Sequence, residues 1–184
     1  MCIRDSTDDD LERVSNLDDY DDKLLLKLSE DEWRNLLILD KLDDLIKRGH
    51  NRILVFCLSV KHSNMLAIFM NMKSNYRCAS ITSDTPPDKR AYWIESFVDD
   101  ENDQPCVLFN YGVLTTGFDA PKTSAAIIAR PTKSLLLYSQ MVGRVIRGDR
   151  VGGTDEAEIW TVVDQKLPGF RDMSEAFWNW EDVW

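Results

Sequence analysis

The stretch CVLFNYGVLTTGFDAP, residues 106–121, joins a short apolar run to a loop rich in glycine and threonine. The run at 106–109 is continuously apolar, which is typical of a strand buried on both faces of a parallel sheet. Further strand-like runs lie at 53–57, 78–81, 125–129 and 159–163. Segments with helical spacing lie beside them at 32–47, 63–72, 86–97 and 135–146. This alternation predicts an α/β fold, an open parallel β-sheet flanked by helices and built from right-handed βαβ units.

The bulk composition excludes several classes of protein. The 184 residues are 43% hydrophobic and 29% charged, which is ordinary for a globular domain. No apolar run is long enough to cross a bilayer, so we expect no membrane partner. Residues 1–6 lack the apolar core of a secretory signal, and we interpret them as a spurious leader. The four cysteines form no CxxC pair, which predicts no metal site and favours buried thiols in a reducing cytoplasm.

Charge is distributed unevenly along the chain, whose net charge is −10. Residues 1–31 hold eleven Asp or Glu against four Lys or Arg, a balance of −7, and the remaining residues carry only −3. This predicts an acidic, disordered linker over 1–31, a folded body over 32–166 and an aromatic-rich helical extension over 167–184. The nearly neutral body neither supports nor excludes a nucleic-acid partner.

The loop at 111–121 sits where ligands bind in open parallel sheets, beyond the carboxyl end of a strand. Its glycines let backbone amides approach an anion, and its threonine hydroxyls can contact a phosphate. A tight surface loop, in which Asp119 satisfies its own turn, is the alternative interpretation.

The segment YSQMVGRVIRG, residues 138–148, places charge on the last predicted helix. Arg144 and Arg147 are three residues apart and therefore project from one helix face, which Gln140 shares one turn earlier. Paired guanidiniums suit the oxygens of a transferring phosphoryl group. Two solvated arginines, favourably placed at a helix carboxyl terminus, are the alternative.

The segments GVLTTGFDAP and YSQMVGRVIRG together resemble motifs V and VI of superfamily-two helicases, with one apolar strand between them. Residues 53–58 resemble motif IV, and 81–83 followed by Arg90 are similar to the segment just beyond it. The resemblance covers roughly 36–164. It implies the second, carboxyl-terminal RecA-like lobe, a P-loop NTPase fold without its own P-loop. Gln140 and the TTGFDAP form resemble the branch of DNA repair and type I and III restriction translocases, which favours DNA over RNA.

The resemblance also implies roles for named residues. ATP with Mg²⁺ would lie between two lobes and be held mainly by an amino-terminal lobe, supplied in cis or in trans. Arg144 and Arg147 would act as arginine fingers on that ATP, and Gln140 would help to sense it. Gly117 and Asp119 would lie at the lobe interface near the ribose. Contacts to the nucleic-acid backbone would come from Thr115, Thr116, Ser59, Lys61 and Thr82.

Two departures from the helicase pattern define the expected activity. The sequence contains neither G-x-x-x-x-G-K-[ST] nor a DExD/H magnesium motif, so we expect this chain alone to be inactive as an ATPase. One alternative is a non-motor lobe that binds nucleic acid or serves as a scaffold for another ATPase chain. Another is an unrelated α/β nucleotide-binding enzyme, which would need a glycine-rich loop after 53–57, where the sequence has CLSVKH instead.

Overall fold

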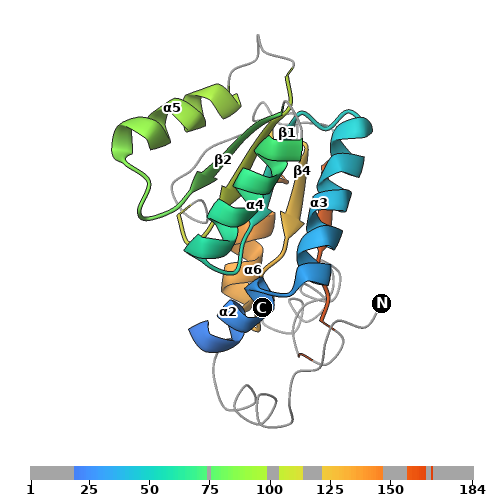
Figure 1. Cartoon of the computed structure of the whole chain (residues 1–184), viewed down its shortest axis with the longest axis vertical. Coiled ribbons are helices and arrows are strands. Elements are labelled where there is room, and N and C mark those ends of the chain that lie inside the picture. The colour runs from blue at the N-terminus through green and yellow to red at the C-terminus, as the bar shows by residue number, and fades with distance from the viewer. Residues whose placement is uncertain are drawn as a thin grey trace, which may run out of the picture.

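A five-stranded, all-parallel sheet with the strand order β2-β3-β1-β4-β5 forms the centre of the protein. The structure is a computed structural model that describes residues 19–73, 76–98, 104–113, 122–146, 157–164 and 167. The strands are β1 (Arg52–Phe56), β2 (Arg77–Ile81), β3 (Cys106–Asn110), β4 (Ala125–Ile128) and β5 (Glu158–Thr161). All five predicted strands are present, and the predicted α/β class is confirmed (Figure 1).

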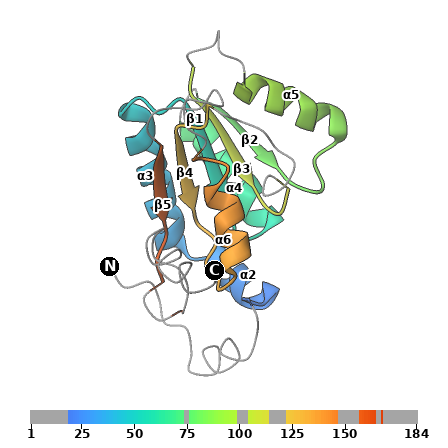
Figure 2. The same ribbon diagram turned by 180° about the vertical axis from the view of Figure 1, so that it is seen from behind.

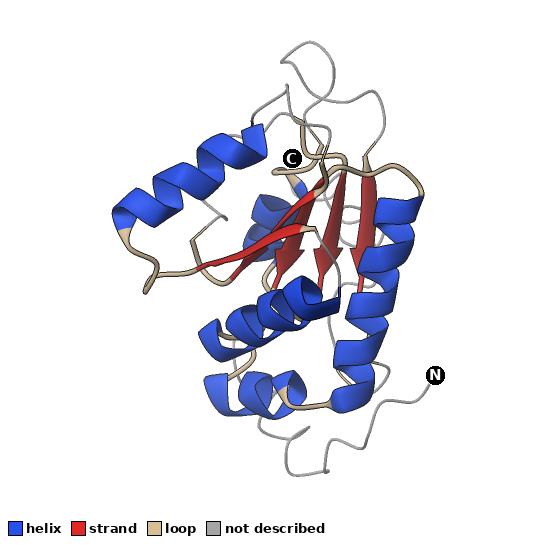
Figure 3. Ribbon diagram, turned by 45° about the horizontal axis from the view of Figure 1, so that its top comes forward, coloured by secondary structure: helices blue, strands red, loops and turns tan. Residues whose placement is uncertain are grey.

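Helices cover both faces of the sheet. On one face lie α2 (Asp22–Ser29), α3 (Glu32–Lys47) and α4 (Val60–Lys73), and on the other α5 (Pro87–Val98) and α6 (Leu135–Val142) (Figures 1 and 2). The core is therefore two apolar layers separated by the sheet (Figure 3). Successive strand residues point to opposite layers, so β1 gives Ile53 and Val55 to the first and Leu54 and Phe56 to the second. Burial on both faces explains why the strands are continuously apolar.

Part of the segment predicted to be a disordered linker is folded, and that prediction is wrong for residues 19–31. Asp21 caps α2 by accepting a hydrogen bond from the Leu24 backbone N–H at 2.8 Å. Tyr20, Leu24 and Leu28 are buried in the same core cluster as β1. The charge balance of residues 1–31 does not reveal this apolar spacing, because the buried residues lie among charged residues that face solvent. Residues 1–18, with the expected leader, lie outside the described part, as does the expected extension apart from Leu167.

The last helix ends earlier than predicted. It was expected to extend over 135–146, but α6 ends at Val142 and Gly143 follows as its cap. The Gly143 amide donates to the Ser139 carbonyl at 2.8 Å, and Val145 then bonds back to Val142 over three residues, which is a tighter turn than an α-helix. Arg144 therefore lies in a turn beyond the helix, whereas Arg147 lies outside the described residues.

Candidate functional site at the edges of the sheet

The carboxyl ends of the five strands meet at one edge of the sheet. From β1 the chain passes to β2 and returns to β3 on one side, and then crosses to β4 on the other side. This reversal makes the end of β1 a topological switch point, where ligands bind in open α/β sheets. Polar residues follow every strand there: Ser59, Thr82, Tyr111, Arg130 and Asp164.

The loop after β3 begins at this switch point. Its described part is Tyr111–Val113, in which Gly112 has a φ of +74°, a left-handed conformation that favours glycine. Asn110, the last residue of β3, is buried and donates from its side-chain amide to the Val55 carbonyl at 3.1 Å. That contact ties the start of the loop to β1. The predicted contact residues Thr115, Thr116, Gly117 and Asp119 lie outside the described residues.

Three other predicted contact residues lie at or near this edge. The Ser59 hydroxyl caps α4 by accepting from the His62 amide at 3.1 Å. Thr82 is buried, and its hydroxyl accepts from the Asp84 amide at 3.3 Å within a turn. Lys61 is exposed, with its ammonium 3.0 Å from the Glu30 carboxylate. Each thus has a local structural partner, and Lys61 reaches farthest into solvent.

The arginine-bearing segment lies apart from this edge. Since β4 and β5 are parallel, α6 starts at the carboxyl edge and runs back along the sheet. Tyr138, Met141 and Val142 form its buried face, and the Tyr138 hydroxyl lies 3.3 Å from that of Thr161 on β5. Gln140 and Arg144 are half-buried, toward the far end of α6, and Arg147 lies outside the described residues. Of these predicted residues the structure thus describes Gln140 and Arg144, but neither Arg147 nor the threonines of the loop after β3.

A buried polar network missed by the sequence analysis holds the loop after β1. Both ring nitrogens of His62 are hydrogen-bonded. Nδ1 accepts from the Leu58 amide at 3.3 Å, and Nε2 lies 2.8 Å from the Asn35 side-chain oxygen. Burial, with a smaller effect from the Arg34 charge, lowers the pKa of His62 to about 3. A neutral imidazole fits both contacts, because one nitrogen accepts and the other donates. The pair fixes α3 against the start of α4.

A second buried contact joins α3 to the ends of β4 and β5. Arg34 is fully buried, and its guanidinium lies 2.5 Å from the Asp164 carboxylate and donates also to the Ala129 carbonyl. Tyr20 lies near this carboxylate, and burial, followed by the charges of Asp164 and Asp19, raises its pKa. These partners are more than ninety residues apart in sequence, so no local pattern could have revealed them.

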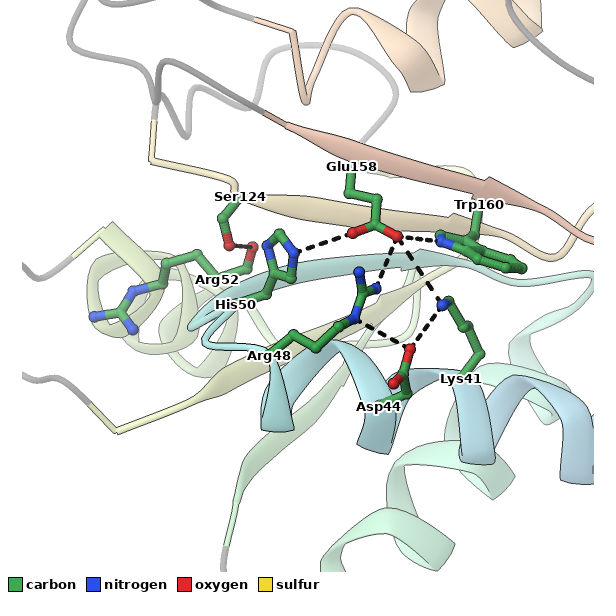
Figure 4. Close-up of polar contacts among 8 residues, drawn as sticks. All are labelled: Lys41, Asp44, Arg48, His50, Arg52, Ser124, Glu158 and Trp160. Carbon is green, nitrogen blue, oxygen red and sulfur yellow. Dashed lines mark hydrogen bonds and ion pairs between the residues drawn. The ribbon is translucent and has the colours of Figure 1, made fainter.

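The amino edge of the sheet carries a different cluster of charges (Figure 4). Glu158 on β5 accepts from Arg48 at 2.7 Å and from the Trp160 indole, and the Lys41 ammonium lies 3.5 Å from the centre of the Trp160 ring. The hydrogen bond from Arg48, more than the charge of Lys41, lowers the pKa of Glu158 to about 2 against an opposing effect of burial. The cluster links β5 to α3 and lies at the opposite edge from the switch point.

Metal-ligand clusters, membrane-spanning helices and reactive thiols are all lacking among the described residues. The described ranges contain no group of three His, Cys, Asp or Glu placed to hold a metal ion. Among the same ranges no helix is long and apolar enough to cross a membrane. Cys57, Cys78 and Cys106 are free and buried, and burial raises the pKa of each. A groove of about 620 Å³ between α3 and α4 is lined largely by apolar atoms, which does not suit a nucleotide phosphate.

Residues 38–149 match the helicase conserved C-terminal domain family. Among similar proteins, the IRC3 helicase of Saccharomyces cerevisiae is 40% identical over 67 residues, 36% of this chain and 9% of that protein. The EcoAI type I restriction endonuclease subunit of Escherichia coli is 24% identical over 176 residues, 90% of this chain and 20% of the subunit. The chain thus spans a fifth or less of these relatives.

A similar architecture occurs in a solved structure. A fragment of an HsdR subunit of a type I restriction enzyme from Vibrio vulnificus superposes with a TM-score of 0.65 and 24% identity, over 79% of this chain and 29% of that one. That likeness supports the RecA-like fold predicted from the sequence. With the family match covering more than half of the residues, this chain belongs to the helicase conserved C-terminal domain family.

Proposed function

We propose that this lobe completes an ATP-driven motor that moves along nucleic acid, with ATP held mainly by a second, amino-terminal lobe. The observation that carries the proposal is the position of the GVLTTGFDAP segment. The described start of that segment, Gly112 and Val113, follows β3 at the carboxyl edge, and the YSQMVGRVIRG segment begins on α6, after β4. The two segments are therefore consecutive along the chain and follow the two strands that flank β1, with the first at the edge where ligands bind.

The described residues do not fit a self-contained site for ATP and Mg²⁺. The loop after β1, where a phosphate-binding loop would lie, is occupied by Leu58, Ser59 and the His62 contact and has no glycine. No described group of acidic side chains could hold the metal. In our proposal the chain instead supplies Arg144 and Arg147, whose charge would stabilise a phosphoryl group bound by the other lobe. Gln140 would contact the same nucleotide, and Gly117 and Asp119 would line the lobe interface.

The nucleic-acid side of the proposal concerns the carboxyl edge. Ser59 and Lys61 follow β1 and Thr82 follows β2, with β3 between these strands, and Thr115 and Thr116 belong to the loop after β3. Hydroxyl and ammonium groups suit a phosphate backbone, whose contacts position a strand without reading its sequence. DNA is favoured over RNA, because a restriction endonuclease subunit aligns with nearly the whole chain. We place this activity in the cytoplasm.

A scaffolding lobe without motor activity is the competing function. It is favoured by the local partners of Ser59, Thr82 and Lys61, since each contact could serve folding alone. The two functions differ in one respect. A motor lobe must transmit strand binding to the nucleotide, whereas a scaffold has no need to.

The experiment compares steady-state ATPase rates of the complete two-lobed protein with and without single-stranded DNA, duplex DNA and RNA. We expect Thr115→Val and Thr116→Val to reduce the nucleic-acid stimulation more than the basal rate, because valine keeps the shape and removes the hydroxyl. Thr123→Val, a change at a buried threonine just before β4, is the control for altered packing. Equal stimulation in the wild-type protein and both variants would contradict a coupling role for this loop.

A further inference from the structure

Asp19 lies just before α2 and reaches across to the connection between β4 and α6. One of its carboxylate oxygens accepts from the Thr132 hydroxyl at 3.1 Å and from the Lys133 amide at 3.0 Å. The other lies 3.5 Å from the Arg130 guanidinium. Three groups within four residues of one connection thus converge on a single carboxylate. Because the charge pattern predicts a linker over residues 1–31, no role for this carboxylate could be predicted.

The contact continues into the first turn of α6. The Thr132 hydroxyl, which donates to Asp19, accepts from the Ser134 amide at 3.0 Å. The Ser134 hydroxyl in turn caps α6 by accepting from the Leu137 amide at 3.3 Å. Thr132 is buried, which strengthens each bond because water competes less well for the same groups. Asp19 is therefore linked through Thr132 to the residue that caps α6.

Arg130 extends the same contact to the loop after β3. Its guanidinium carbon lies 5.5 Å from the centre of the Tyr111 ring, a cation–π distance, while its terminal nitrogen faces Asp19. Its backbone amide donates to the Phe56 carbonyl at 3.1 Å, which holds the residue at the end of β1. Tyr111 is the first residue after β3. Arg130 thus contacts both the start of the GVLTTGFDAP loop and, through Asp19, the start of α6.

We propose that Asp19 and Arg130 are positioning residues that fix the loop after β3 and the helix bearing Gln140 relative to one another. The contact joins Tyr111, the first residue after β3, to the connection that leads from β4 into α6. In the motor, a shift of Tyr111 on strand binding would be transmitted through Arg130 to α6 and so to Arg144. This inference rests on the proposed function. Arg130 and Asp19 need touch neither ATP nor nucleic acid.

The first test follows amide hydrogen exchange in the complete protein and needs no activity. Asp19→Ala should speed exchange over 132–142 while exchange in α3 and β1 stays unchanged. Asp19→Asn should have a smaller effect, because an amide oxygen still accepts from Thr132 and Lys133. Asp40→Ala is the matched control, since Asp40 is an exposed acid whose nearest ammonium, that of Lys73, is 3.7 Å away. Unchanged exchange over 132–142 in Asp19→Ala would overturn the positioning role.

The second test measures the ratio of nucleic-acid-stimulated to basal ATPase rates. Arg130→Gln and Tyr111→Leu should each lower this ratio by roughly fivefold or more, the lower end of typical coupling between sites. The double variant should lose little beyond either single change, because both break one contact. Tyr111→Phe keeps the ring and should keep the ratio. Full stimulation in Arg130→Gln, or equal loss in Tyr111→Phe and Tyr111→Leu, would overturn the inference.

The two tests separate this inference from the function on which it rests. Absence of stimulation in the wild-type protein would contradict the motor proposal, while the exchange measurement would still report on Asp19. Normal wild-type stimulation with no response in the Arg130 and Tyr111 variants would leave the motor proposal standing and overturn the relay.

Discussion

The two edges of the sheet both carry charged side chains, and they use them differently. At the carboxyl edge, Arg34 and His62 are almost completely buried and hold loops that follow the strands. At the amino edge, Glu158 and Arg48 are partly open to water and join β5 to the end of α3. Buried polar contacts have few alternative geometries, because an unpaired partner is costly. The carboxyl edge is therefore built to hold loops in one arrangement, while the amino edge adds stability without fixing a site.

The largest effect on the free energy of unfolding is expected when the buried pair at the carboxyl edge is broken. Arg34→Ala should lower the free energy of unfolding by about 3–5 kcal/mol, because the Asp164 carboxylate would remain buried without its partner. Urea unfolding followed by circular dichroism measures this. The double variant Arg34→Met with Asp164→Leu removes both charges and should be less destabilised than Arg34→Ala. A loss below 1 kcal/mol in Arg34→Ala would show that this charge is not buried as the structure has it.

A pH series tests the burial of His62 at the carboxyl edge. The folded pKa of His62 is about 3, below its ordinary value of 6.5, so only the unfolded chain gains a proton as pH falls below 6.5. Unfolding should therefore become easier by about 1–2 kcal/mol between pH 7 and pH 5. His62→Gln should flatten this dependence. A slope in His62→Gln equal to that of the wild-type protein would contradict the assignment.

A smaller effect is expected at the amino edge. The folded pKa of Glu158 is about 2, so its ionised form stabilises the fold above the ordinary pKa of 4.5, and this contribution is lost as pH falls toward 2. Glu158→Gln should cost about 1 kcal/mol at pH 7, reduced from the full pKa shift because the side chain is partly solvated. The difference from wild type should shrink in high salt and below pH 4. If the stability lost in Glu158→Gln depended on neither salt nor pH, packing and not charge would hold this cluster together.

The strands and the parallel class of the sheet followed from the sequence more fully than the site did. The strands are buried on both faces, with Phe109 in one apolar layer and Leu54 in the other. This requirement appears in the sequence as short, continuously apolar runs. Helix α2 was not predicted because its few leucines lie in a stretch whose acids dominate the charge balance of residues 1–31. The end of α6 was missed because the turn at Gly143 looks like a continued helix.

The contacts that hold the candidate site could not be predicted from the sequence, for a different reason. Asp19 lies 111–114 residues from its partners, and Arg34 lies 130 from Asp164. An isolated Asp, Arg or His has many ordinary surface roles, and only the fold shows which are brought together. The motifs at 112–121 and 138–148 could be found because their spacing is local, although the roles of their residues stay predictions.

The central claim is that this lobe acts on ATP bound elsewhere, and its arginines test that claim most directly. In the complete protein, Arg144→Ala and Arg147→Ala should each slow single-turnover hydrolysis by about a thousandfold or more, the usual contribution of an arginine finger. Affinity for ATP should change little, because the other lobe would hold the nucleotide, and the unfolding midpoint of each variant is measured alongside as a check on folding. Arg48→Ala, at the amino edge, is the control. Near-normal hydrolysis in both arginine variants would contradict the account.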